Sequence, residues 1–268
     1  MKENNVSNER LLYLKKRRIG LLSIHFTRIT LLVLFLFLWE FSARLNLIDS
    51  FLFSMPSQII LTIKNLAVSG ELWLHIGTTL LETLLGFIIA TVVGTAIALL
   101  LWWSDFFRKV CEPFIVVLNG LPKIALGPII IVWFGAGVKS IVFMAIIITI
   151  IVTIISMQNG FLATAKGKIF LLKSLGATKF EILLKLVIPS SLPTFTSCLK
   201  INVGMAWIGS IMGEYLVSKQ GIGYLIVYGG QVFRLDLVMA STVILCILAT
   251  LMYGAVAITE KLLLKWQN

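Results

Sequence analysis

The chain has 268 residues, of which 59% are hydrophobic and only 13% are charged, whereas soluble domains have about 45–50% and 25%. A soluble fold of this length cannot bury so much apolar surface, so most of it must face lipid or other spanning helices. The net charge of +11 would suit a nucleic-acid partner, but the positive residues cluster beside apolar segments, as topology signals do. We therefore expect an all-α integral membrane protein that binds no nucleic acid.

The chain starts with a polar segment that closes on a basic cluster, Lys15 to Arg18. An apolar run follows, without the A-x-A-like cleavage site of a signal peptide. We interpret residues 1–27 as a cytoplasmic N-terminal segment that leads into an uncleaved first span. Residues 28–268 are expected to form a single transmembrane domain, since no internal repeat, low-complexity tract or second soluble domain is visible.

Six segments are long and apolar enough to cross a bilayer, since a helix rising 1.5 Å per residue needs about 20 residues to cross a core of about 30 Å. An even number of spans puts both termini on one side. Of the 23 Lys and Arg residues, 15 fall on the side of the N-terminus, five on the opposite side and three within or at the rim of spans. This bias predicts cytoplasmic termini. The six spans run over about 28–44, 75–103, 111–134, 139–157, 189–212 and 237–264.

The external segment from Asp49 to Leu74 contains apolar residues at helical spacing after Pro56. Proline is favoured at the first position of a helix. The pattern predicts an amphipathic helix that lies at the membrane interface. An ordinary ordered loop is the alternative.

A basic loop of about residues 159–188 joins the fourth and fifth spans. Gly176 separates two stretches that could form short helices, 170–175 and 178–187, and a glycine there permits a positive φ and a sharp turn. Pro189 then starts or bends the fifth span. Such a helix–turn–helix, exposed to the cytosol and rigidly attached to a span, can transmit the movement of a soluble motor to the spans behind it. A basic loop that contacts anionic lipid is the alternative.

The residues around this turn resemble the coupling loop of bacterial ABC importer permeases. The resemblance rests on Leu175-Gly176-Ala177 followed by Val187-Ile188-Pro189. More narrowly, about residues 54–264 resemble the sulfonate, taurine and nitrate branch of that family. The matching segments are Leu121-Pro122-Lys123-Ile124-Ala125-Leu126-Gly127-Pro128, Ile131-Val132-Trp133-Phe134-Gly135, Leu192-Pro193 with Lys200-Ile201-Asn202-Val203-Gly204-Met205-Ala206-Trp207, Gly213-Glu214-Tyr215, and Gly221-Ile222-Gly223.

The sequence departs from the family pattern in two places. The Glu-Ala-Ala that usually opens the coupling motif would fall at Phe170, Leu171 and Leu172, and none of these matches. The acidic contact that relatives make to the motor at that point is therefore not carried over. Glu82 stands where many relatives have a basic residue, so the charge lining of the second span differs.

The resemblance implies the type I ABC importer permease fold, with a cytoplasmic coupling helix, in a bacterial inner or plasma membrane. Two permease copies would form the pathway, two cytoplasmic ATPase subunits would dock on the coupling loops, and an external binding protein would deliver the solute. The chain lacks a phosphate-binding Gly-rich loop with Lys-Ser/Thr, so ATP and Mg are expected on the ATPase, and the permease itself needs no cofactor. The residues expected to couple to the ATPase are Lys173, Ser174, Leu175, Gly176, Ala177, Thr178, Phe180 and Pro189.

The resemblance favours an organosulfonate, taurine or a nitrate-like anion as the solute. The same branch also serves vitamin precursors and other heteroaromatic solutes, and Glu82 weakens a purely anionic interpretation. A stand-alone secondary transporter is a further alternative, although six unrepeated spans argue against it.

Charged side chains inside spans cost about 2.5–3.5 kcal/mol at the centre, so they usually face a cavity or a partner. Lys123 lies between Pro122 and the Gly127-Pro128 pair, where the third span must be broken or kinked. An anionic solute could bind Lys123 at such a break, and a structural kink with a snorkelling or paired lysine is the alternative. The residues expected to line the pathway are Pro122, Lys123, Lys200, Trp207, Glu214 and Glu82.

Lys200, Gly204 and Trp207 share one face of the fifth span, where Gly204 is expected to permit close helix approach. An ion pair of Lys200 with Glu214 or Glu82 is the favoured interpretation, and a transient contact with solute is the alternative. Glu214 could instead belong to an external gate or to the dock for the binding protein.

No catalytic or metal site is predicted. The chain has no His-Glu-x-x-His motif, and His25 and His75 are isolated near the interfaces. An intramembrane enzyme would need a nucleophile–base pair or a metal cluster within the spans. The three cysteines sit in or beside apolar segments without pairing or ligand spacing, which is typical of small core residues.

Overall fold

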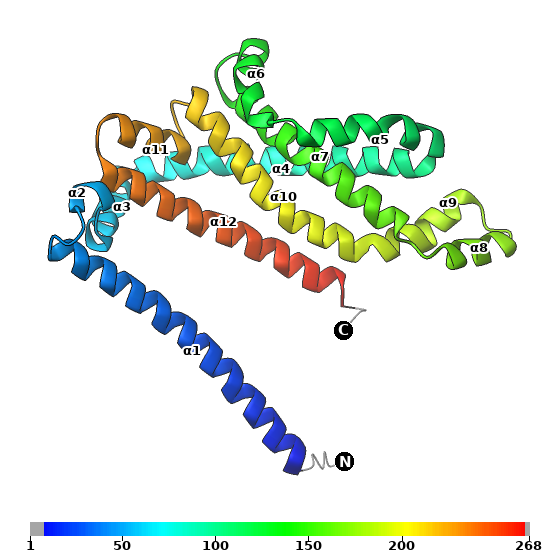
Figure 1. The fold of residues 1–268 in the computed structure, drawn as a ribbon, viewed down its shortest axis with the longest axis horizontal. Helices are drawn as coiled ribbons and strands as arrows, with labels where there is room; N and C mark the ends of the chain where they lie inside the picture. The colour runs from blue at the N-terminus through cyan, green and yellow to red at the C-terminus, as the bar shows by residue number, and fades with distance from the viewer. Residues whose placement is uncertain (1–7, 266–268) are drawn as a thin grey trace.

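The computed structural model describes residues 8–265, and within that range every regular element is helical. Figure 1 shows the helices forming an elongated bundle, with α2, α3 and α11 at one end and α8 and α9 at the other. In chain order the elements are α1 (Asn8–Arg44), α2 (Ser50–Phe53), α3 (Pro56–Ser69), α4 (Glu71–Trp103), α5 (Asp105–Gly120), the 3-10 helix η1 (Lys123–Leu126), α6 (Gly127–Phe134), α7 (Val138–Leu162), α8 (Lys166–Ser174), α9 (Lys179–Ile182), the π-helical stretch η2 (Leu183–Val187), α10 (Ile188–Val217), α11 (Ile222–Gln231) and α12 (Leu235–Leu263).

Five helical segments of the described chain are long and apolar enough to cross a membrane: Lys15–Arg44, Glu71–Trp103, Val138–Leu162, Lys179–Val217 and Leu235–Leu263. A sixth is a pair of helices, Asp105–Gly120 and Lys123–Phe134, bent by 88°. With this pair counted as one span, the number agrees with the six that the sequence predicts.

The bend in the third span lies at Leu121-Pro122, where Leu121 is extended, with φ −68° and ψ 138°. A residue before proline is pushed out of the α region, and proline offers no N–H to continue the helix. The expected break beside Lys123 is therefore confirmed. The first arm of the pair also starts earlier than predicted, at Asp105, because the Ser104 hydroxyl accepts a hydrogen bond from Phe107 N at 3.4 Å and caps α5.

Helices α4, α7 and α10 form the centre of the bundle. Small residues let their backbones approach, because a Cβ at Gly209 would lie 2.5 Å from Ala145 Cα, and one at Gly213 would lie 2.9 Å from Ile141 Cα. Close packing over small residues is the usual way for spanning helices to associate. The expectation for Gly204 is wrong, since a Cβ there would meet nothing within 4 Å.

The segment after Pro56 is helical, as predicted: α3 starts on that proline and ends at Gly70, which has a φ of +82°. It buries Ile59 and Thr62, and the Thr62 hydroxyl donates to Asp236 Oδ2 at 2.9 Å, which joins α3 to the first turn of α12. Helix α1 contacts this α2–α3 region and extends away from the other helices (Figure 1). It runs without interruption through the predicted start of the first span at residue 28, while residues 1–7 of the predicted leader lie outside the described part.

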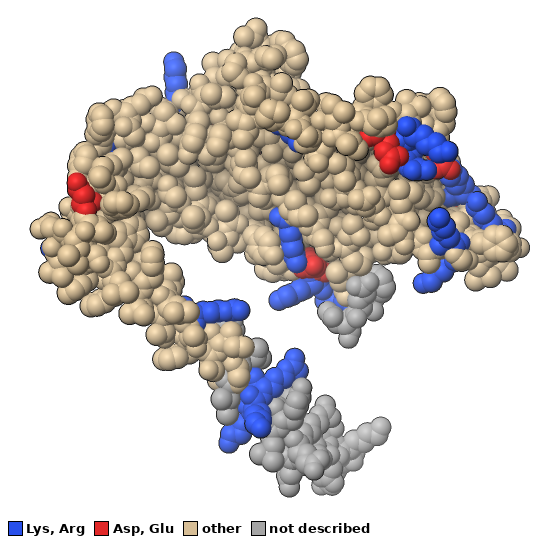
Figure 2. All heavy atoms as spheres, viewed as in Figure 1, with Lys and Arg blue, Asp and Glu red and all other residues tan. Residues whose placement is uncertain are grey.

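Charge is distributed unevenly over the surface. Figure 2 shows a broad uncharged area over the middle of the bundle, with Lys and Arg gathered over the end that carries α8 and α9 and along the free half of α1. Many large apolar side chains are exposed along the helices, among them Val132, Ile258 and Leu251. Such a surface requires lipid or other spanning helices around it.

Candidate functional site

The turn between α8 and α9 has the shape that Gly176 predicts. Gly176 has a φ of +84°. Its N–H donates to Lys173 O at 3.0 Å, and the next N–H, of Ala177, donates to Leu172 O at 3.0 Å. These two bonds make a Schellman motif, which ends α8 and reverses the chain.

Helix α9 then starts with a capping box that links Thr178 and Glu181. The Thr178 hydroxyl oxygen accepts from Glu181 N at 3.3 Å, and the Glu181 carboxylate accepts from Thr178 N at 2.9 Å. The two bonds satisfy donors at the start of the helix that would otherwise have no partner. The Thr-x-x-Glu spacing is the sequence signal for this cap, which the turn glycine alone does not reveal.

The two-helix segment, α8 and α9, is joined to the bundle without a flexible connection, because α9 continues through η2 directly into α10. Ile182, Leu183 and Val187 are buried in a cluster with Met157 and Phe161 of α7, which also includes Ala98 of α4 and Cys198 of α10. Pro189 occupies the first turn of α10, where its missing N–H costs little. A force on α9 is therefore applied directly to the ends of α7 and α10.

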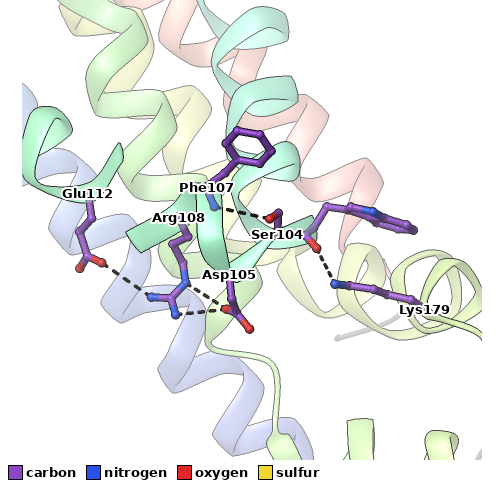
Figure 3. Close-up of polar contacts among 7 residues, drawn as sticks. Ser104, Asp105, Phe107, Arg108, Glu112 and Lys179 are labelled. Atoms are coloured by element: carbon purple, nitrogen blue, oxygen red, sulfur yellow. Dashed lines mark hydrogen bonds and ion pairs between the residues drawn. The ribbon is translucent and has the colours of Figure 1, made fainter. Parts of the chain in front are cut away.

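Lys179 adds a link to α4 that the sequence analysis missed. Its ammonium donates to the backbone carbonyl of Trp103, and it lies 5.8 and 5.3 Å from the ring centroids of Trp102 and Trp103. Figure 3 shows Lys179 approaching the α4–α5 junction. The last carbonyls of a helix have no partner within it, and a cation there also complements the helix dipole.

The α4–α5 junction has its own ion pairs. Arg108 lies 3.2 Å from Asp105 and 3.7 Å from Glu112, so one guanidinium joins two turns of α5 (Figure 3). These pairs are partly exposed, and such contacts contribute little individually. Their effect is confined to α5, where they connect its first turns beside the α4 end that Lys179 contacts.

The surface of the two-helix segment is apolar as well as basic. Phe170, Leu175 and Phe180 are 72%, 74% and 57% exposed. Exposed apolar side chains rimmed by lysines are typical of a protein interaction surface. Of the residues expected to couple to the ATPase, six are exposed and two are half-buried: the exposed set is Lys173, Ser174, Leu175, Gly176, Thr178 and Phe180, and the half-buried pair is Ala177 and Pro189.

The charged residues expected in the pathway do not form one site. Lys200 lies 2.5 Å from Glu260 of α12, so the expected pairing with Glu214 or Glu82 is wrong. Lys123 donates to Asn119 O at 3.1 Å, across the bend beside Pro122. Trp207 is buried in a separate apolar cluster with residues of α11 and α12.

Glu82 and Glu214 are the two that the fold brings together. Both are 1% exposed, and they are buried as close neighbours between α4 and α10. Glu214 Oε2 accepts from Gly223 N at 2.6 Å and from Tyr224 N at 3.3 Å, which caps the start of α11. A Cβ on Gly221 would overlap the Glu214 carboxyl group. The Gly-Ile-Gly segment is therefore needed for the carboxylate to reach this helix end.

Two side chains of α4 complete the cap on α11. His75 Nδ1 accepts from Gly221 N at 2.9 Å, and Thr79 Oγ1 accepts from Ile222 N at 2.8 Å. Together with Glu214 they satisfy the N–H groups that a helix start leaves free. His75, which the sequence left without a role, is thus a structural acceptor.

Comparison with known proteins identifies the family. Residues 83–265 match the model of the binding-protein-dependent transport system inner membrane component. The chain belongs to this family. The formylaminopyrimidine transport permease protein ThiX of Halalkalibacterium halodurans is 31% identical over 86% of this permease and 92% of its own length. The taurine transport system permease protein TauC of Escherichia coli K12 is 24% identical over 88% of each chain.

A solved structure agrees on the fold. The MetNI methionine ABC transporter, in an inward-facing conformation, has a chain that matches with a TM-score of 0.64. The alignment covers 72% of the permease and 97% of that chain, at 19% identity. The expected fold of ABC importer permeases is confirmed. The family also confirms that the protein is a multi-pass transport subunit of the inner membrane, which works with a separate ATPase and a binding protein rather than as an enzyme.

Proposed function

We propose that two copies of this permease form an import pathway and that the α8–α9 segment, residues 166–182, receives the ATPase subunits. ATP and Mg are bound by those subunits, and the permease converts their closure into movement of its spans. The single observation that carries the proposal is the rigid, apolar-faced turn at Gly176, continuous with α10 and linked to α4. The residues proposed to couple are those predicted from the sequence, with Lys179 added.

The proposed orientation places the α8–α9 end, the N-terminus and the C-terminus in the cytoplasm. The positive-inside rule supports it, since 15 of the 23 Lys and Arg residues are assigned to that side. The α2, α3 and α11 end would then face the external binding protein. Lipid would cover the exposed apolar faces that the second permease copy leaves free.

Taurine, an organosulfonate or a nitrate-like anion is the solute that the sequence resemblance favours. The taurine permease TauC supports this class, and the formylaminopyrimidine permease ThiX supports the alternative of a vitamin precursor. In the described chain, Lys123 is the cation beside the broken span, where an anion would gain from an interrupted helix. The proposed pathway residues remain Pro122, Lys123, Lys200, Trp207, Glu82 and Glu214, of which only the neighbours Pro122 and Lys123 and the pair Glu82 and Glu214 lie together in the fold.

Site-specific photo-crosslinking tests the docking surface and the orientation together. A photoreactive amino acid at Leu175, in the turn, is expected to crosslink to the ATPase subunit in membranes that contain the whole transporter. The matched control is Val68 at the end of α3, which is 81% exposed and lies at the opposite end of the bundle. Crosslinking of the ATPase to Val68 instead of Leu175 would reverse the proposed orientation.

A further inference from the structure

The buried carboxyl pair has no counterion in the described part of the chain. No Lys or Arg whose side chain the structure describes forms an ion pair with Glu82 or Glu214, and both Glu82 oxygens lack a hydrogen-bond donor among those residues. Glu214 is explained by its cap on α11, but Glu82 caps nothing. A buried carboxyl group without a hydrogen-bond partner is costly, so Glu82 makes the isolated permease less stable than an apolar side chain would.

Glu82 also lines a cavity of about 320 Å³ that reaches the end of the bundle carrying α11. Thr78 of α4, Gly137 and Ile141 at the start of α7, and Lys219 and Gln220 after α10 line it with Glu82. Lys219 and Gln220 are exposed and form its rim, whereas Glu82 is buried. Glu82 therefore lies at the inner end of the cavity, roughly 16 Å along α4 from its first residue.

The charge of this inner end selects the kind of group that fits. Two neighbouring carboxyl groups in a buried site are not both ionised, because like charges so close repel strongly. The pair therefore carries at most one negative charge, and the Glu82 oxygens are acceptors without an N–H donor. An anionic group would find no donor there, whereas an ammonium or amino group would supply the N–H donors that Glu82 lacks.

We propose that Glu82, backed by Glu214, binds an amino or ammonium group of the transported solute. The proposal rests on the proposed import function and narrows its substrate class to small solutes that carry a basic or amino nitrogen. Nitrate and simple alkyl sulfonates are excluded. Two solute types fit: an aminosulfonate such as taurine, whose sulfonate would face Lys219 at the rim, and an aminopyrimidine, whose exocyclic amino group would reach Glu82.

Equilibrium binding to the permease–ATPase complex in nanodiscs tests this assignment. The probes are radiolabelled taurine and formylaminopyrimidine. Each has a matched competitor without the nitrogen donor: isethionate, in which a hydroxyl replaces the ammonium of taurine, and the pyrimidine that lacks the amino group. We expect saturable binding of one probe, with at least tenfold weaker competition by its matched analogue. The probe that binds distinguishes the aminosulfonate from the aminopyrimidine.

Glu82→Gln is expected to weaken binding of that probe at least tenfold, which is about 1.4 kcal/mol. The matched control is Glu71→Gln, which removes an exposed carboxylate from the first turn of the same helix and should leave the affinity unchanged. The wild-type comparison of each probe with its analogue does not depend on a variant that folds.

Equal affinity for a probe and its analogue would overturn the proposal, as would unchanged binding in Glu82→Gln or no saturable binding of either probe. Copurification of the ATPase with the permease is measured in the same preparations. A complex that assembles but fails these binding tests would contradict only the substrate assignment. Failure to assemble would contradict the proposed function itself.

Discussion

Replacing Lys179 with methionine should loosen the junction between α9 and the end of α4. Methionine keeps an apolar stem but loses the ammonium, which donates to the Trp103 carbonyl and lies over two indole rings. A hydrogen bond from a charged donor contributes about 1.5–3 kcal/mol, and an exposed cation–π contact adds about 0.5–1 kcal/mol. Because Lys179 is exposed, we take the lower end, about 2 kcal/mol in total.

A loss of about 2 kcal/mol raises the population of the locally opened junction roughly 30-fold, since each 1.4 kcal/mol is a factor of ten. Hydrogen exchange of the amides in residues 179–187, measured by mass spectrometry on the permease in nanodiscs, reports that population directly. The expected result is a 10- to 30-fold loss of protection in α9 and η2, and a lower yield of transport per ATP in the complete transporter.

The matched control for this experiment is Lys185→Met, on the same segment. Lys185 is exposed and pairs with Glu181 at 3.3 Å along one helical turn, a surface contact that contributes little to stability. In Lys185→Met, the rate of amide hydrogen exchange in residues 179–187 should change less than threefold. The reasoning is refuted if the amides of residues 179–187 in Lys179→Met exchange at the wild-type rate, or no faster than in Lys185→Met. Lys179 would then not hold α9 to α4.

Three further sets of substitutions test the turn at Gly176, the packing of the central helices and the Lys200 ion pair. In Gly176→Pro, the proline cannot adopt the observed φ of +84° and lacks the N–H that donates in the Schellman motif. Membrane insertion should persist, whereas ATP-driven uptake should be lost. Normal uptake would contradict the docking role of the turn. Gly209→Ala should lower the melting temperature, because its Cβ would lie 2.5 Å from a facing backbone atom. Gly204→Ala should leave the melting temperature unchanged or raise it, because its Cβ would meet nothing within 4 Å. The reverse order of the two melting temperatures would contradict the packing. Lys200→Met should destabilise the permease by leaving Glu260 unpaired. The double variant that exchanges the two charges, Lys200→Glu with Glu260→Lys, should recover part of the lost stability. No recovery would show that the ion pair does not stabilise the permease.

Local sequence chemistry predicted the parts of the fold that depend on few residues. The positive φ of Gly176 and the break at Leu121-Pro122 follow from backbone rules that hold in any context. Span number and the helix after Pro56 follow from apolar length and periodicity. These features need no knowledge of what packs against them.

Contacts between distant helices could not be predicted in the same way. Lys200 pairs with Glu260 because of how α12 lies along α10, which hydropathy does not specify. The caps that His75 and Thr79 place on α11 likewise require the packing of α4 beside it. Glu82 was recognised as a charge that departs from the family pattern, but only the fold shows that it meets Glu214 at the end of a cavity.

Uptake in proteoliposomes tests the central claim most directly. The permease is reconstituted alone, with its ATPase, and with both the ATPase and the external binding protein, and uptake of radiolabelled taurine and formylaminopyrimidine is followed with and without ATP. Uptake of one of these solutes is expected only in the complete system and only with ATP. Uptake by the permease alone, driven by the solute or an ion gradient, would contradict its function as the membrane subunit of an ATP-driven importer.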